Sequence, residues 1–149
     1  TISSFAQDGK SIYQKYSDSE NISAVYVSPA MFKMIGKLPD IELNDGEVNF
    51  YPIIKSLTGL YIINSENAGI NAQLYADVEK FIKSGKYELL MEAKDSGQTV
   101  RMYTVGNDVT VNSFVMIARD GGETTFICID GNMNRSDLEK LLAEQANKK

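Results

Sequence analysis

The feature that most constrains the fold is a run of four strand-like segments between residues 87 and 129, joined by short turns. Each turn contains glycine: Asp95-Ser96-Gly97, Gly106-Asn107-Asp108 and Asp120-Gly121-Gly122. Turns of this length connect antiparallel neighbours, because parallel strands need a crossover of roughly a dozen residues or more. The second half of the chain is therefore predicted to form an antiparallel meander.

The hydrophobic pattern differs among these four segments. In residues 111–119 and 124–129, apolar side chains fall on both faces, which is typical of strands at the centre of a sheet. In residues 87–94, apolar and mostly polar residues alternate. This alternation predicts one dry face, formed by Tyr87, Leu89, Met91 and Ala93.

Helical periodicity marks two longer segments. Apolar residues at three- and four-residue steps predict a first helix from Ile2 to Tyr16, and a second whose inner stripe runs from Ile70 to Ile82. Ser65 is expected to cap the second helix and Gly85 to end it. A final helix is predicted from the capping box at residues 136–139 (Ser-Asp-Leu-Glu).

Shorter elements lie between the first two helices. Residues 22–27 and 60–63 are rich in β-branched and aromatic residues and predict two strands. Ser28-Pro29 predicts the start of a short helix, and Pro52 predicts one helical turn. Residues 37–51 are open to two interpretations: a small hairpin around an Asn-Asp-Gly turn, or a mobile acidic loop.

Taken in order, these elements predict a single α+β domain over residues 1–149. Two strand-then-helix units precede the four-strand run. We therefore expect a two-layer structure, with a mixed, largely antiparallel sheet of about six strands and helices packed on it. A chain of 149 residues is long enough to bury a core without disulfides or metals.

Composition excludes several kinds of chemistry. The chain has no histidine and 1 cysteine, so Ser-His-Asp and Cys-His catalysis and Cys/His zinc sites cannot be built. A net charge of −5 with scattered lysines and arginines argues against a nucleic-acid partner. We expect no enzymatic activity, no cofactor and no metal.

No apolar run approaches the ~20 residues that span a bilayer. The chain begins at Thr1 rather than Met, so an export leader could precede this sequence. Membrane anchoring is therefore expected only through such a leader.

One acidic stretch has the alternating oxygen ligands of a calcium loop. It contains Asp40, Glu42, Asp45 and Glu47, but an EF-type loop starting at Asp40 needs glycine at position 45 and glutamate at position 51. Position 51 is Tyr51. We interpret the stretch as a solvated loop.

A second stretch has the same alternation in Asp130, Asn132 and Asn134. Arg135 and Leu141 occupy the positions that calcium loops reserve for glycine and glutamate. We interpret it as a polar turn before the final helix.

Two other groups have plain structural interpretations. Glu88 and Glu92 could serve as paired carboxylates of a glycosidase, but they are expected to form cross-strand ion pairs with Arg101. Cys128 lies within Phe-Ile-Cys-Ile, a setting typical of a buried, inert thiol.

The 8 tyrosines, with no tryptophan, raise the hypothesis of carbohydrate or peptide binding. Four of them lie on predicted strands, where aromatic residues are favoured for packing. The other four are expected to reach the surface. The candidate interaction surface combines these four with the acidic stretch: Tyr13, Tyr16, Tyr51, Tyr75, Asp40, Glu42, Asp45 and Glu47.

Four segments resemble an uncharacterised exported bacterial family, the domain of unknown function 4252. They are residues 24–32 (AVYVSPAMF), 57–63 (LTGLYII), 87–92 (YELLME) and 129–133 (IDGNM). The resemblance implies an exported protein, made with a signal or lipoprotein leader and located in the periplasm or on an envelope membrane. It also implies an association with envelope signalling or stress, and it supplies no catalytic residues.

Three hypotheses follow. The first is a non-catalytic interaction or binding module of the bacterial cell envelope, with a protein or small molecule as its partner. Its working surface is expected to be the sheet face or the connection at residues 37–51. The second is a small-molecule sensing domain with a pocket between sheet and helices. The third is a histidine-free enzyme that uses paired carboxylates.

Overall fold

The strands of this chain form one sheet in the order β1-β2-β6-β5-β4-β3. The computed structural model describes residues 8–37 and 51–147, without the side chains of Tyr51, residues 141–142 and residues 144–147. Within that part of the chain, the strands are β1 (Ile22–Val27), β2 (Leu57–Ser65), β3 (Glu88–Asp95), β4 (Gln98–Gly106), β5 (Thr110–Asp120) and β6 (Glu123–Asn134). The helices are α1 (Gly9–Tyr16), α2 (Pro29–Gly36), α3 (Tyr51–Lys55), α4 (Ala68–Ser84) and α5 (Arg135–Asn147).

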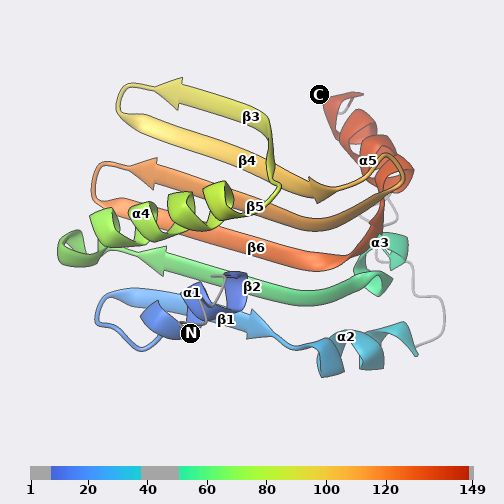
Figure 1. Ribbon diagram of the computed structural model, residues 1–149, viewed down its shortest axis with the longest axis horizontal. Helices are drawn as coiled ribbons and strands as arrows, with labels where there is room; N and C mark the ends of the chain where they lie inside the picture. The colour runs from blue at the N-terminus through green and yellow to red at the C-terminus, as the bar shows by residue number, and fades with distance from the viewer. Residues whose placement is uncertain (1–7, 38–50, 148–149) are drawn as a thin grey trace, which may run out of the picture.

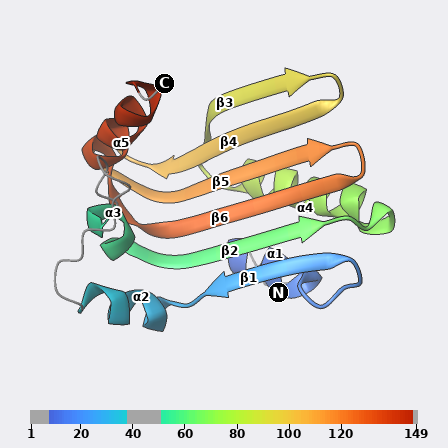
Figure 2. The same cartoon turned by 180° about the vertical axis from the view of Figure 1, so that it is seen from behind.

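The α+β class and the antiparallel meander are confirmed, but the expected mixed sheet is wrong. All five strand pairings of the described residues are antiparallel. The reason is that α2 and α3 lie at the same end of the sheet, so β2 starts near the end of β1 and runs back beside it (Figure 2). Helix α4 then carries the chain from β2 to β3 at the opposite edge, and the meander returns to β2 (Figure 1).

Helices α1 and α4 cover one face of the sheet, which we call the covered face (Figure 1). Leu74 and Val78 of α4 are fully buried against Ile63 of β2 and Phe126 of β6. Burying a side chain of this size stabilises the fold by about 1.5–3 kcal/mol. Ile12 and Tyr16 of α1 belong to the same core, so this layer holds both helices on the sheet.

The opposite face of the sheet, the open face, is also apolar. In β2, β5 and β6, buried covered-face residues alternate with half-buried residues on the open face. The prediction that β5 and β6 are central is confirmed. Among the described residues, this face is covered at one end only, where α5 and Ile53 of α3 line a pocket on it. The apolar residues of the open face therefore indicate that their strands are central, but not that the whole face is covered.

The predicted dry face of the first meander strand is confirmed for Tyr87, which packs against the core just before β3, and is wrong for Leu89, Met91 and Ala93. Every residue of β3 is exposed, because β3 is an edge strand. A bulge between Leu89 and Met91 also breaks the alternation. As a result Leu90 lies beside Thr104 in a pocket on the open face, while Met91 pairs with Met102.

Two of the predicted helix caps are wrong, and two are confirmed. Gly85 ends α4, as predicted. Ser28 caps α2, with Pro29 at the first helical position, as predicted. Asn67 rather than Ser65 caps α4, because β2 continues through Ser65. The side chain of Asn134 accepts the backbone N–H of Asp137 at the start of α5, so the capping box at 136–139 is not the helix start.

The first helix begins later than its periodicity predicts. Asp8 caps α1, and Gly9 is its first residue. Residues 1–7 lie outside the described residues, as does the segment 38–50, for which a hairpin or a mobile loop was predicted.

Candidate interaction surface

A single apolar row crosses all six strands on the open face. We call it the middle row; strand register aligns its members side by side in the order Val25, Ile62, Ile127, Met116, Met102 and Met91. The two edge residues, Val25 and Met91, are 47% and 42% exposed, and the other four are half-buried. An antiparallel sheet with a free face normally carries polar side chains there. This row is therefore unusually apolar for the less covered face of an antiparallel sheet.

The rows on either side of the middle row carry almost no charge. One contains small and polar side chains, among them Asn64, which donates to Thr125 across the β2–β6 pair at 2.8 Å. The other contains Leu60, Ile129 and Phe114. On β1, β2, β6, β5 and β4 these three rows contain no charged residue.

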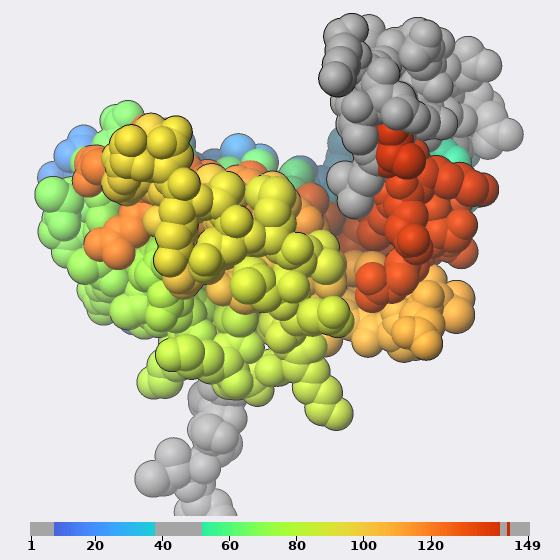
Figure 3. All heavy atoms as spheres, turned by 90° about the horizontal axis from the view of Figure 1, so that it is seen from above, coloured from blue at the N-terminus to red at the C-terminus, as the bar shows by residue number. Residues whose placement is uncertain are grey.

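An apolar pocket lies where α5 meets the open face. Its volume is about 390 Å³, and Phe114, Ile129 and Leu138 are among its lining residues. Arg135 and Glu139 of α5 also line it. Figure 3, which looks onto the β3 edge, shows α5 at one end of the sheet and α4 on its other side. The pocket is large enough for a small apolar ligand.

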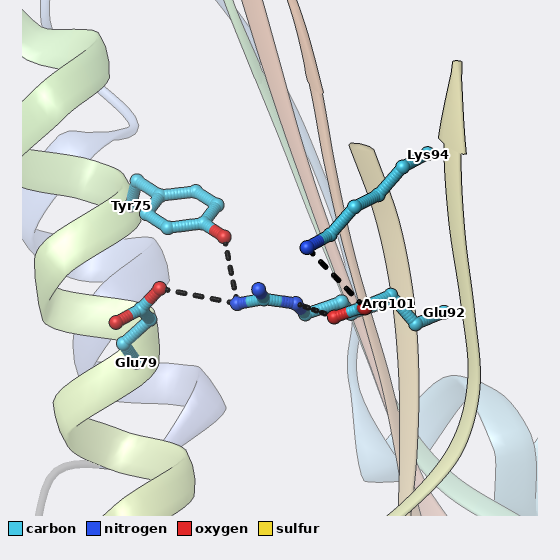
Figure 4. Close-up of polar contacts among 5 residues, drawn as sticks. All are labelled: Tyr75, Glu79, Glu92, Lys94 and Arg101. Carbon is cyan, nitrogen blue, oxygen red and sulfur yellow. Dashed lines mark hydrogen bonds and ion pairs between the residues drawn. The ribbon is translucent and has the colours of Figure 1, made fainter. Parts of the chain in front are cut away.

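The covered face ends in a polar cluster where α4 meets the β3–β4 hairpin (Figure 4). Arg101 donates to Glu92 at 2.6 Å, to the Tyr75 hydroxyl at 2.9 Å and to Glu79 at 3.3 Å. The bond to Glu92, opposed by desolvation, raises the pKa of Arg101 and lowers that of Glu92. The carboxylates neutralise a guanidinium, so they are held as ion-pair partners and not as an acid–base pair.

The expected ion pairing of the β3 acids is confirmed for one of them. Glu92 lies opposite Arg101 in the strand register, whereas Glu88 lies opposite Thr104. The two carboxylates therefore do not converge on one guanidinium. Thr104 lies on the open face and Arg101 reaches α4 on the covered face, so Glu88 and Glu92 lie on opposite faces of the sheet and do not flank a common site.

A second polar cluster surrounds Cys128, which is fully buried. Its Sγ lies 3.7 Å from Ser113 Oγ and 3.6 Å from an oxygen of Asp130, and Tyr87 donates to Ser113 at 3.2 Å. Burial raises the pKa of the Cys128 thiol, and the nearby Asp130 carboxylate raises it further. Burial also raises the pKa of Asp130. The thiol is thus held protonated, in agreement with the inert cysteine predicted from sequence.

The stretch Asp130–Asn134 is not the polar turn that the sequence predicts. It belongs to β6, and Asp130 and Asn134 pair with residues of β5. The alternation of polar residues there reflects strand geometry and a bulge between Val111 and Ser113.

The tyrosines of the predicted interaction surface lie in different environments. Tyr16 is 3% exposed and donates to Asp77, so the expectation that it reaches the surface is wrong. Tyr13 is half-buried and packs on Tyr26 and Tyr61, with ring centroids at 5.6 and 6.2 Å. Tyr75 is half-buried in the Arg101 cluster.

The remaining predicted surface residues cannot be grouped with these tyrosines. Tyr51 begins α3, and its side chain is not described. Asp40, Glu42, Asp45 and Glu47 lie outside the described residues. The structure therefore brings none of the eight together in one site within the part of the chain it describes.

The sequence predicted a sheet face as a possible interaction surface, but not which face it would be or which residues would form it. The doubly apolar patterns of β5 and β6 predicted central strands. Once the helices are placed, the same patterns also indicate that more apolar surface is present than the described helices cover. The apolar pattern of these strands shows that both faces are apolar, but it does not show whether another part of the molecule covers the second face.

Among the described residues, no helix is long and apolar enough to cross a membrane. No curated protein and no solved structure matches this chain. A family model matches residues 16–141, which include every strand, and this match confirms the resemblance seen in the sequence. The chain therefore belongs to the family described as domain of unknown function DUF4252.

Proposed function

We propose that this domain is a non-catalytic binding module of the bacterial cell envelope that uses its open face to hold an apolar partner surface. The observation that carries the proposal is the middle row, six apolar residues side by side that no described helix fully covers. Contiguous apolar patches of this kind are rare on soluble monomers and commonly mark interaction sites. The envelope location in this proposal rests on the sequence resemblance, which implies an exported protein.

The polar clusters support binding over catalysis. The carboxylates at Arg101 are neutralised by the guanidinium, and the Cys128 thiol is buried and protonated. Nucleophilic or general acid–base catalysis needs an accessible group with a suitable pKa. The described clusters offer no such group, whereas the open face offers a large accessible area.

Site-specific photocrosslinking in cells that export the full-length protein tests the proposal. A photoreactive residue would replace Met116 in the middle row, and in the control it would replace Met34, which is 66% exposed on α2. We expect a discrete adduct from position 116 and none from position 34. No adduct at position 116, or turnover of a hydrolase substrate panel by the purified protein, would contradict the proposal.

A second candidate function is the binding of a small apolar molecule in the 390 Å³ pocket beneath α5. Its apolar lining suits an acyl chain, and Arg135 suits a carboxylate at one end. A fluorescent fatty acid would report binding. Phe114→Trp would fill the pocket and is expected to weaken binding about tenfold or more, whereas Val109→Trp, at an exposed site, would leave it unchanged.

A further inference from the structure

We infer that a pocket between α2, α3 and the start of β2 binds a phosphate group attached to a small apolar body. This pocket, which we call the lysine pocket, shares no residue with the middle row, so the inference does not depend on the proposed role of the open face. Its volume is about 460 Å³, within the range of small-molecule sites. Helices α2 and α3 lie at the same end of the sheet (Figure 2), and both contribute to the lining.

The charge of the lining selects an anion. Among the described residues that line the pocket, three are lysines (Lys33, Lys37 and Lys55) and none is Asp or Glu, although the chain carries a net charge of −5. Lys33 and Lys37 are exposed, and neither forms an ion pair with a carboxylate of the described residues. They lie one helical turn apart on α2, where like charges repel each other. An anion bound between them would relieve this repulsion.

The helix dipoles do not account for all of this positive charge. One lysine near a helix C-terminus offsets the partial charge of about −0.5 that the terminus carries. Lys33 and Lys37 bring two full charges to the end of α2, and α3 has 5 residues, so its dipole is small. The lysine pocket therefore stays positive after the dipoles are counted.

Neutral groups of the lining supply further hydrogen-bond donors. The Oδ1 atom of Asn132 already accepts from Asn112 at 3.2 Å, which leaves the Nδ2 group of Asn132 as a donor. Thr58 adds a hydroxyl. A phosphate group offers three acceptor oxygens and up to two negative charges, so it matches a lining of ammonium, amide and hydroxyl donors.

The rest of the lining is largely apolar. Pro29, Phe32 and Leu57 contribute to it, and Phe32 is 6% exposed, so its ring anchors α2. Inorganic phosphate alone would leave this apolar part uncovered. A ligand that joins an aromatic or aliphatic body to the phosphate would use both parts of the pocket.

One side of the pocket is fixed by the backbone of β6. The N–H of Asn132 donates to the Ser56 carbonyl oxygen at 2.9 Å, and a Cβ at Gly131 would lie 2.6 Å from the same oxygen. The junction of α3 and β2 is thus seated tightly on β6. A site whose walls exist before binding loses little conformational entropy when a ligand enters.

Titration of the purified protein with phenyl phosphate, followed by NMR of the backbone amides, tests the inference. We expect saturable shifts confined to residues 29–37, 55–58 and 132. Inorganic phosphate should bind more weakly, because it lacks the apolar body. Phenol should cause no comparable shift, because it lacks the charge.

Lysine variants test the role of the charges. Lys33→Gln and Lys37→Gln should each raise the dissociation constant for phenyl phosphate about tenfold, because each removes a charged hydrogen-bond donor. Lys83→Gln is the matched control, since it removes an exposed lysine from the last turn of α4, and it should leave the constant unchanged.

Vesicles distinguish two sources of the phosphate. Co-sedimentation with phosphatidylcholine vesicles that contain phosphatidic acid, but not with pure phosphatidylcholine, would assign the phosphate to a lipid headgroup if Lys33→Gln and Lys37→Gln reduce it. Binding of phenyl phosphate without vesicle binding would assign it to a soluble molecule.

Three outcomes would overturn the inference. The first is that neither phenyl phosphate nor the phosphatidic acid vesicles bind. The second is that phenol binds as well as phenyl phosphate. The third is that Lys83→Gln weakens binding as much as the two variants in the lysine pocket.

Discussion

At the residue scale, Asp77 is the side chain that ties α1 to α4. It accepts hydrogen bonds from the Tyr16 hydroxyl and from Lys15, the latter at 2.8 Å. Burial opposes its ionisation, but the bonds from Lys15 and Tyr16 outweigh burial and lower the pKa of Asp77. Tyr16 looked like a surface residue in the sequence because a tyrosine on a helix stripe serves equally well in a core or at its rim. Only the position of Asp77, 61 residues away, settles its role.

The Tyr16–Asp77 bond predicts a pH-dependent loss of stability. Tyr16→Phe keeps the ring and removes the donor, so the free energy of unfolding should fall by about 1.5–3 kcal/mol at pH 7. A lowered pKa means that the ionised Asp77 stabilises the fold above its unfolded pKa of about 3.9, and that this contribution is lost as pH falls through the folded pKa. Urea unfolding from pH 7 down to pH 3 should therefore show the two proteins converging. The control is Tyr13→Phe, which removes a hydroxyl with no bond to Asp77; an equal loss there would contradict the assignment.

At the element scale, the seating of α1 depends on the absence of a side chain at Gly9. A Cβ at this position would lie 2.5 Å from Cys128 Sγ, so the helix start sits directly on β6. The caps show the same dependence on neighbours. Ser65 and Ser136 have good local capping signals, but β2 extends through Ser65 and Asn134 caps α5. Local motifs predicted that these helices exist, while strand pairing decided where they begin.

Gly9→Ala is expected to destabilise the protein although alanine is the better helix former. Helix propensity alone favours the substitution by up to about 1 kcal/mol, whereas overpacking costs about 1–3 kcal/mol. We expect the melting temperature to fall. Cys128→Ala removes the sulfur, so the double variant should lose less stability than the two single changes combined. An additive result in this double-mutant cycle would show that the contact is not the cause.

At the scale of the whole molecule, the sequence predicts the element order, the pairing of β3 to β6 as a meander and the central position of β5 and β6, but not how β1 and β2 join this meander. The order β1-β2-β6-β5-β4-β3 joins β2 to β6, so that Asn64 contacts Thr125, 61 positions later. Neither β2 nor β6 carries a sequence signal that identifies its partner strand, since both are apolar. The sequence predicted a sheet face as a possible interaction surface, but not the residues of the middle row, because this row exists only once six strands lie side by side. The tyrosines that the sequence did single out are spread over different elements.

This topology predicts slow folding for a domain of its size. The β3–β6 meander can form from local contacts, but the β2–β6 pair requires closure of a long loop. Refolding followed by tyrosine fluorescence in a stopped-flow instrument should therefore take milliseconds to seconds. Complete folding in microseconds would indicate that this pair does not limit the rate.

The methionine half of the middle row gives the open face a chemical sensitivity. Met91, Met102 and Met116 are adjacent across three strands, and Met91 is 42% exposed. Oxidants convert a thioether into a polar sulfoxide, and reductases can reverse the change. Oxidation would thus begin at Met91, on one edge of the face, and would make the face progressively more polar toward its centre. The buried core on the other side of the sheet would keep its packing.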